Sequence, residues 1–176
     1  MKTTLTCVLL GLAGCSGVPD PVDPSCTRGS LEADFAVSAP MSGRAVGADG
    51  ALAPPPAGTK YVLSSTYLRL QKGERVAKRF RELMAPINAA LATHDGLMAI
   101  QFAFSEKCTV ARTLSVWRDE AAMYKFVGTQ AHSAAVSEVS DVSRGGSVVT
   151  HWLGTEAEAT WDVARARLGA DDGPQY

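Results

Sequence analysis

The sequence has no surplus of positive charge and no long hydrophobic run. Its 176 residues carry 17 Lys and Arg against 18 Asp and Glu, which gives a formal net charge of -1 at pH 7. This balance disfavours nucleic acid as a partner, because binding to a phosphate backbone needs a cationic surface. Charged residues make up 20% and hydrophobic residues 46%, proportions typical of a soluble globular chain. A chain of this length has room for one compact domain.

The motifs of several enzyme classes are also missing. The sequence contains no Gly-x-Ser-x-Gly nucleophile elbow, no phosphate-binding loop and no dinucleotide fingerprint, so hydrolase, kinase and Rossmann oxidoreductase functions lack support. It has 3 His and 4 Cys residues, with no Cys-x-x-Cys and no close His pair. A zinc site needs such a cluster of ligands, so we expect no metal centre.

The N-terminus has the pattern of a bacterial export signal. A basic start, Met1-Lys2, precedes an apolar run from Thr3 to Leu12 that is too short to span a bilayer. Leu12-Ala13-Gly14-Cys15 resembles the lipobox of bacterial lipoproteins, in which the Cys is lipidated and becomes the first mature residue. We therefore expect a signal peptide over 1–14 and a membrane anchor on Cys15. The alternative is a plain secretory signal with an incidental Cys.

The residue after the lipobox predicts the location. Ser16 stands where resembling lipoproteins of the inner membrane carry Asp. This predicts an outer-membrane lipoprotein of the cell envelope, on the periplasmic or the surface face.

Two cysteines remain for the mature domain. Cys7 leaves with the signal peptide and Cys15 carries the lipid, so Cys26 and Cys108 share an oxidising compartment. They form either a disulfide that joins the N-terminal segment to the domain or two separate thiols, since sequence fixes no distance between them.

The mature chain divides into a Pro-rich N-terminal part and a periodic core. Residues 15–30 contain three prolines and no periodicity, which predicts a flexible tether after the lipidated Cys. Residues 31–58 predict one extra strand and a loop rich in Pro and Gly. We expect the compact domain over 59–168 and a disordered tail over 169–176.

Within the core, the hydrophobic pattern switches between the periods of strands and helices. Period 2 predicts strands over 61–70, 97–104, 109–117 and 147–153. Spacings of three and four predict a helix after Gly73 that Pro86 should kink or split, a helix capped by Asp119 and interrupted near Gly128, and a last helix after Thr155. This order, β-α-β-β-α-β plus a C-terminal helix, is that of a ferredoxin-like split βαβ fold of the α+β class. Helices cover one face of such a sheet, and the other face needs a partner.

One face of the predicted sheet carries small or polar side chains. They alternate with bulky residues on the second and third strands and are Ala99, Gln101, Ala103, Ala111, Thr113 and Ser115. Such a face can enclose a cavity with a few hydrogen-bonding groups, while the bulky face carries the helices. The alternative is the half-wet face of an ordinary antiparallel sheet. Arg112 interrupts the bulky set and is interpreted as the end of its strand.

Residues 113–127, with Ala131-His132 shortly after them, resemble the antibiotic biosynthesis monooxygenase (ABM)-like superfamily, and within it the subgroup similar to spheroidene monooxygenase. The shared pattern is a strand, Trp117, an acidic helix cap, an aromatic residue, and a helix kink that carries His132. The resemblance covers about residues 59–154. It implies a dimeric α/β barrel, a homodimer in which two sheets pack face to face and each subunit keeps a pocket between its sheet and helices.

The resemblance implies functions of two classes. One is cofactor-independent oxidation of a small aromatic or polyene-like molecule, with His132 as candidate base and Gln101 and Trp117 as further catalytic candidates. The other is a non-catalytic lipoprotein that binds a hydrophobic ligand or haem, or that only dimerises. Haem-degrading members of the fold place Trp and His where this chain has Phe126 and Val136, so haem degradation is disfavoured. Haem ligation by His132 stays as an alternative.

The histidines also have structural interpretations. The simplest role of His132 is to satisfy free carbonyls at the helix interruption. His94 lies in a polar turn before Asp95-Gly96 and is expected to be exposed. His151 lies in the middle of its strand, faces the helices, and is expected to be a hydrogen-bonded core residue.

Overall fold

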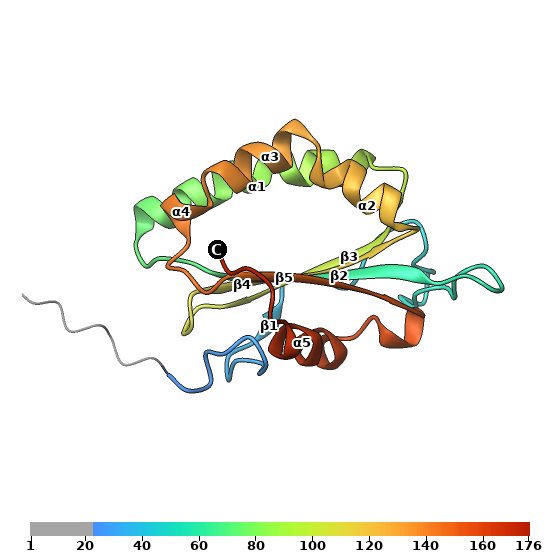
Figure 1. Ribbon diagram of the computed structural model, residues 1–176, viewed down its shortest axis with the longest axis horizontal. Coiled ribbons are helices and arrows are strands. Elements are labelled where there is room, and N and C mark those ends of the chain that lie inside the picture. Colours follow the sequence, from blue (N-terminus) through green and yellow to red (C-terminus); the bar gives the residue numbers. More distant parts are fainter. Residues whose placement is uncertain (1–22) are drawn as a thin grey trace, which may run out of the picture.

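The computed structural model describes residues 23–176, so the predicted signal peptide, Cys15 and the first part of the tether lie outside the described residues. The described chain forms a five-stranded antiparallel sheet between two layers (Figure 1). The strands are β1 (Ala36–Val37), β2 (Tyr61–Arg69), β3 (Leu97–Ser105), β4 (Val110–Trp117) and β5 (Val148–Gly154), in the order β1-β3-β4-β2-β5. The α+β, ferredoxin-like arrangement predicted from the sequence is confirmed.

Four helices form the layer over one face of the sheet (Figure 1). They are α1 (Glu74–Thr93), α2 (Glu120–Val127), α3 (Gln130–Ser137) and α4 (Val139–Val142). Asp119 caps α2 as predicted, accepting the N–H of Ala122 at 2.7 Å. Helix α1 continues through Pro86, where a split was predicted. Leu83 and Leu91, one on each side of the proline, are both buried, and this packing holds the two halves of α1 in place.

The opposite face of the sheet is covered by the same chain. Helix α5 (Trp161–Ala170) lies on it together with residues 23–58, which we call the strap (Figure 1). The side chains at the centre of this face are completely buried, and they are Leu63, Ala99, Leu114 and Val116. The prediction of a bare face was wrong, because segments outside the predicted core fold back over it. A second subunit can pack here only by displacing them.

Arg112 holds the strap to the sheet. It lies in the middle of β4, not at a strand end as predicted, and its side chain is 1% exposed. Its guanidinium donates to the Glu32 carboxylate at 2.8 Å and to the Ser30 carbonyl at 2.6 Å, and it lies over the Tyr67 ring. A buried charge is tolerated only with such partners. The strap therefore supplies what this strand position requires.

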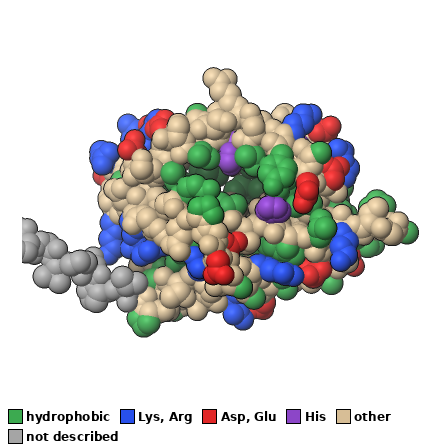
Figure 2. All heavy atoms as spheres, in the orientation of Figure 1, with side chains coloured by type: hydrophobic (Ala, Val, Ile, Leu, Met, Phe, Trp, Pro, Cys, Tyr) green, Lys and Arg blue, Asp and Glu red, His purple; other side chains and the backbone are tan. Residues whose placement is uncertain are grey.

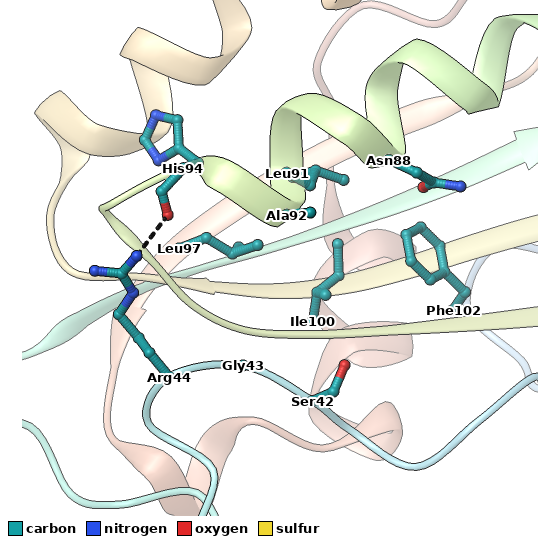
Figure 3. Close-up of a pocket in the computed structure, with 10 residues that line it drawn as sticks. All are labelled: Ser42, Gly43, Arg44, Asn88, Leu91, Ala92, His94, Leu97, Ile100 and Phe102. Carbon is teal, nitrogen blue, oxygen red and sulfur yellow. Dashed lines mark hydrogen bonds between the residues drawn. The ribbon is translucent and has the colours of Figure 1, made fainter.

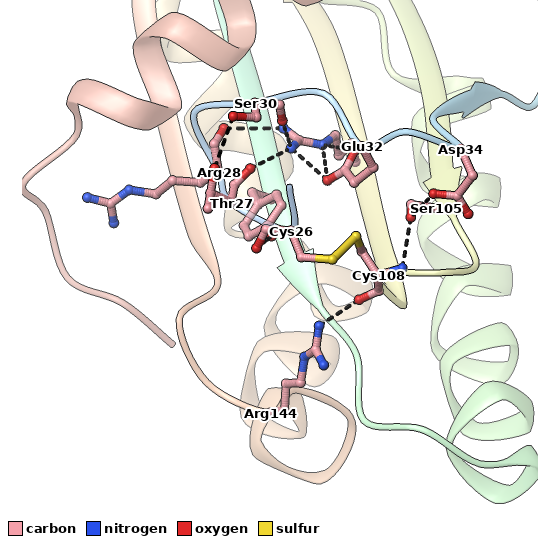
Figure 4. Close-up of polar contacts among 11 residues, drawn as sticks. Cys26, Thr27, Arg28, Ser30, Glu32, Asp34, Ser105, Cys108 and Arg144 are labelled. Atoms are coloured by element: carbon pink, nitrogen blue, oxygen red, sulfur yellow. Dashed lines mark hydrogen bonds and ion pairs between the residues drawn. A yellow bond between two sulfur atoms is a disulfide. The ribbon is translucent and has the colours of Figure 1, made fainter. Parts of the chain in front are cut away.

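A disulfide fixes the first residues of the strap. Cys26 and Cys108 are bonded, with their Cα atoms 5.4 Å apart, and the Tyr67 hydroxyl donates to the Cys26 carbonyl at 2.9 Å. Figure 4 shows this disulfide beside the polar contacts of Thr27, Ser30 and Glu32. Residues 23–30, predicted to belong to a flexible tether, are thus packed on the domain.

Two further segments differ from the prediction. The extra strand within 31–58 is only the two-residue β1, which pairs with the edge of β3. The tail over 169–176 was predicted to be disordered, but Tyr176 and Ser147 exchange two backbone hydrogen bonds. No helix within residues 23–176 is long and apolar enough to cross a bilayer.

Candidate functional site

Four hydroxyl residues form a floor on the face of the sheet that looks toward the helix layer. Cross-strand pairing places Ser64 of β2 opposite Ser115 of β4, and Thr66 opposite Thr113. Val62, two residues before Ser64, packs against Met123 and Phe126 of α2. Because side chains alternate along a strand, Ser64 and Thr66 also face the helices. We call these four residues the hydroxyl floor.

The helix layer packs on the sheet at the two ends of this floor. At one end, Val62 and Trp117 join residues of α1 and α2 in a buried cluster. At the other end, Leu70 packs against a buried cluster of α1 and Val142. Between the clusters, Ser64, Thr66 and Thr113 are only half-buried. The space-filling view shows a hollow between the layers with hydrophobic side chains around it (Figure 2).

The elements that border the hollow expose large apolar side chains. On α2, α3 and β5 these are Tyr124, Val127, Val136, Val149 and Leu153, which are 40% to 56% exposed. Val149 and Leu153 face the helix layer, since they pair with Thr66 and Val62. An apolar rim around a floor with a few polar groups is typical of a site for a small hydrophobic molecule.

Two hydroxyls of the floor have no partner among residues 23–176. Ser115 accepts from the Trp117 indole at 2.9 Å, and Ser64 donates to the Thr150 carbonyl at 3.1 Å. No described residue hydrogen-bonds the hydroxyl of Thr66 or Thr113. These two groups are therefore available to a ligand or to water.

His132 belongs to an aromatic cluster at the α2 end of the floor. Its ring lies 5.2 Å from the Phe126 ring, which stacks on Trp117 at 5.2 Å. Burial lowers the pKa of His132, and a hydrogen bond with the Val127 backbone opposes this shift. This shift favours the neutral imidazole, which is the form that can accept a proton. His132 and Trp117, two of the predicted catalytic residues, both pack against Phe126.

Gln101, the third catalytic candidate, lies on the other face of the sheet. Its side chain accepts from the Trp161 indole at 2.7 Å and donates to the Ala39 carbonyl at 3.1 Å. Both partners belong to the layer of α5 and the strap. This position gives Gln101 a structural role, and it cannot act with His132.

The prediction that the six small or polar residues share one face of the sheet was also wrong. Ala99, Gln101 and Ala103 pair with Val116, Leu114 and Arg112, so they lie on the strap side. The other three predicted pocket residues, Ala111, Thr113 and Ser115, lie on the helix side with Phe102 and Ile100 as their neighbours. The pairing of β3 with β4 sets this arrangement, and it includes a bulge between Leu97 and Ala99. The hydrophobic pattern of one strand does not show which of its residues pair with which residues of the neighbouring strand.

The other two histidines also differ from the prediction. His94 is buried, not exposed, and its ring packs edge-on against Trp117 at 5.3 Å. Its Nδ1 accepts the N–H of Gly96, and burial lowers the pKa of His94. His151 is exposed instead of buried, and its ring lies 6.1 Å from that of Tyr124 at the open edge of the sheet.

A pocket of about 330 Å³ opens at the β3 edge of the sheet (Figure 3). Apolar side chains of α1 and β3 line it together with Arg44 of the strap and Asn88 of α1. Two of its residues, Ile100 and Phe102, are cross-strand neighbours of Ser115 and Thr113, so the pocket adjoins the hydroxyl floor. Sequence reasoning missed Arg44, because nothing in the pattern of 31–58 predicts where the strap runs. Residues 23–176 contain no cluster of three His, Cys, Asp or Glu side chains able to hold a metal ion.

Comparison with known proteins shows the fold. No protein family and no curated protein sequence matches the chain. A candidate monooxygenase from Fusobacterium nucleatum is similar over 69% of this chain and 49% of its own, with a TM-score of 0.51 and 10% identity. A candidate antibiotic biosynthesis monooxygenase from Caulobacter crescentus (TM-score 0.47, 19% identity) matches over 53% of this chain and 89% of its own. A Mycobacterium tuberculosis protein, with a TM-score of 0.47 and 13% identity, matches over 52% of this chain and 92% of its own.

The match to the Fusobacterium nucleatum protein shows the fold of the domain. The chain shares an α+β fold with the Fusobacterium nucleatum protein, whose TM-score is 0.51, and this agrees with the fold expected from the residues around Trp117. Since the identities are low, the likeness concerns the fold alone, and the function depends on the residues of the site.

Proposed function

We propose that this protein is an envelope lipoprotein whose monooxygenase-like domain binds a small hydrophobic molecule in the hollow above the hydroxyl floor. The observation that carries the proposal is the pair of hydroxyls, Thr66 and Thr113, that no described residue hydrogen-bonds, on a floor with an apolar rim. A ligand with an apolar body and one or two hydrogen-bonding groups satisfies both features. The lipobox at Cys15 supports a lipid anchor, and Ser16 after it supports the outer membrane as the location.

Binding is tested with N-phenyl-1-naphthylamine, a neutral apolar dye that fluoresces when it leaves water. We expect saturable binding to the chain from residue 16 onward, which keeps every described residue. Thr113→Phe fills the centre of the hollow and should abolish this binding. Ala166→Phe, at an exposed position of α5 on the opposite side of the sheet, should leave it unchanged. Equal binding by both variants would place the dye elsewhere and refute the proposed site.

A second candidate function is oxidation of the bound molecule by O₂ without a cofactor. The neutral, part-buried His132 favours it, because such an imidazole can take a proton from a phenol and leave an electron-rich anion that reduces O₂. Oxygen uptake with a panel of phenols and hydroquinones tests this function. We expect uptake by the native chain and none by His132→Gln, while dye binding persists. Binding without uptake by the native chain leaves the binding function alone.

Haem is the ligand that competes for the same histidine. The His132 ring is half-buried and packs against Phe126, and neutral imidazole is the form that ligates haem iron. Addition of haemin separates the two uses. A sharp Soret band that is lost in His132→Ala identifies a haem protein and overturns cofactor-free oxidation.

Palmitate labelling that is lost in Cys15→Ser tests the lipid anchor.

A further inference from the structure

The strap forms one wall of the pocket at the β3 edge. Ser42 and Ile100 exchange backbone hydrogen bonds of 3.0 and 2.8 Å, and Ala45 donates to the Met98 carbonyl at 3.0 Å. Between these contacts Gly43 has a φ of +150°, and a Cβ there would lie 2.4 Å from the Met98 carbonyl oxygen. Only glycine allows the strap to approach β3 this closely. The next residue, Arg44, is thereby fixed beside the pocket.

Arg44 brings a positive charge that no carboxylate within residues 23–176 neutralises. Its one hydrogen bond goes to the backbone carbonyl of His94, at 3.3 Å (Figure 3). No acidic side chain among the described residues forms a salt bridge with it. Its side chain is exposed, so the guanidinium keeps most of its five N–H donors for another partner.

The rest of the pocket is suited to an apolar body. Leu91, Leu97, Ile100 and Phe102 line it between Arg44 at one end and Asn88 at the other (Figure 3). Its volume of about 330 Å³ accommodates a molecule of two or three rings or a short alkyl chain. A cation at the edge of an apolar pocket selects amphipathic anions, because Arg binds carboxylates and sulfonates through charge-assisted hydrogen bonds.

We propose that the pocket at the β3 edge binds a small apolar anion, with its carboxylate or sulfonate on Arg44 and its apolar body over Ile100 and Phe102. This inference deepens the proposed binding function and rests on it, since Phe102 adjoins Thr113 of the hydroxyl floor. It narrows the ligand class from any hydrophobic molecule to one with a single negative charge.

Two dyes with the same ring system test the proposal. 1-Anilinonaphthalene-8-sulfonate is N-phenyl-1-naphthylamine with a sulfonate added. We expect Arg44→Gln to weaken binding of the sulfonate about tenfold, the effect of losing one charged hydrogen bond. Binding of the neutral dye should change less than about twofold in the same variant. Arg165→Gln, an arginine of α5 on the opposite side of the sheet, is the matched control and should affect neither dye.

The outcomes separate this inference from the proposed function. If the neutral dye does not bind the native chain, the binding function itself fails. If the neutral dye binds and Arg44→Gln changes both dyes equally, the charge has no role and only the anion proposal is overturned. Ala92→Trp, which places a large side chain on a lining residue of the pocket, should reduce sulfonate binding at least as much as Arg44→Gln. Unchanged binding in Ala92→Trp would place the sulfonate outside this pocket.

Discussion

Glu32 provides the sharpest test of how the strap is held. Its carboxylate and the Arg112 guanidinium are 2.8 Å apart, and their side chains are 0% and 1% exposed. Glu32→Gln removes the negative charge and keeps the size, so the Arg112 charge stays buried without its counter-ion. Breaking a buried pair on one side destabilises proteins by about 3 to 5 kcal/mol. Because Arg112 keeps the Ser30 carbonyl and the Tyr67 ring, we expect about 3 kcal/mol.

Urea unfolding followed by tryptophan fluorescence measures this loss. With a urea m-value of about 2 kcal/mol/M, the midpoint should fall by roughly 1.5 M. Asp162→Asn breaks the exposed pair with Arg165 and should cost less than about 1 kcal/mol. The double variant Arg112→Met with Glu32→Leu removes both charges and should recover most of the stability. If Glu32→Gln is no more harmful than Asp162→Asn, the strap is not held by this pair.

Three further predictions concern the disulfide, the strap and pH. Replacing both Cys26 and Cys108 by Ser opens a loop closed across 82 residues and should lower the free energy of unfolding, measured in urea, by about 2 to 4 kcal/mol. Dithiothreitol should destabilise the native chain by a similar amount and leave the stability of the variant unchanged. Gly43→Ala should destabilise the chain by about 1 to 3 kcal/mol. The control Gly50→Ala should cost less, because nothing lies within 4 Å of a Cβ added there. Equal losses of stability would contradict the close approach of the strap to β3 at Gly43. Burial lowers the pKa of His132 in the folded chain, so below about pH 6.5 the unfolded chain binds a proton at this residue more readily than the folded chain does. The free energy of unfolding should therefore decrease as the pH is lowered from about 7.5 to 5, as measured by urea unfolding. His132→Gln should make this pH dependence weaker, and an unchanged dependence would refute the prediction.

The elements of the core could be predicted because their hydrophobic periods are clear. The strand predicted over 61–70 is β2 over Tyr61–Arg69, and the helix cap at Asp119 is present. These features depend on residues close together in sequence, which a single sequence contains. The interruption at Gly128 is local as well, and it separates α2 from α3 as predicted.

The layers and the site depend on contacts that are distant in sequence. Arg112 looked out of place on a strand, because its partner Glu32 is 80 residues away. The sorting of Ala99 and Thr113 onto opposite faces follows from the strand register, which no local pattern contains. His132 and Trp117 could be named from the motif, whereas Arg44 became a candidate only when the path of the strap was known.

Methyl NMR tests the central claim most directly, since it shows where a hydrophobic molecule binds. The chain from residue 16 onward, with labelled Ile, Leu and Val methyl groups, is titrated with N-phenyl-1-naphthylamine. We predict shifts at Ile100 and Val149, which border the hydroxyl floor on the helix side, and none at Leu114 or Val116, which lie under the strap. Shifts confined to Leu114 and Val116, or no shift at saturating dye, would contradict the proposed site.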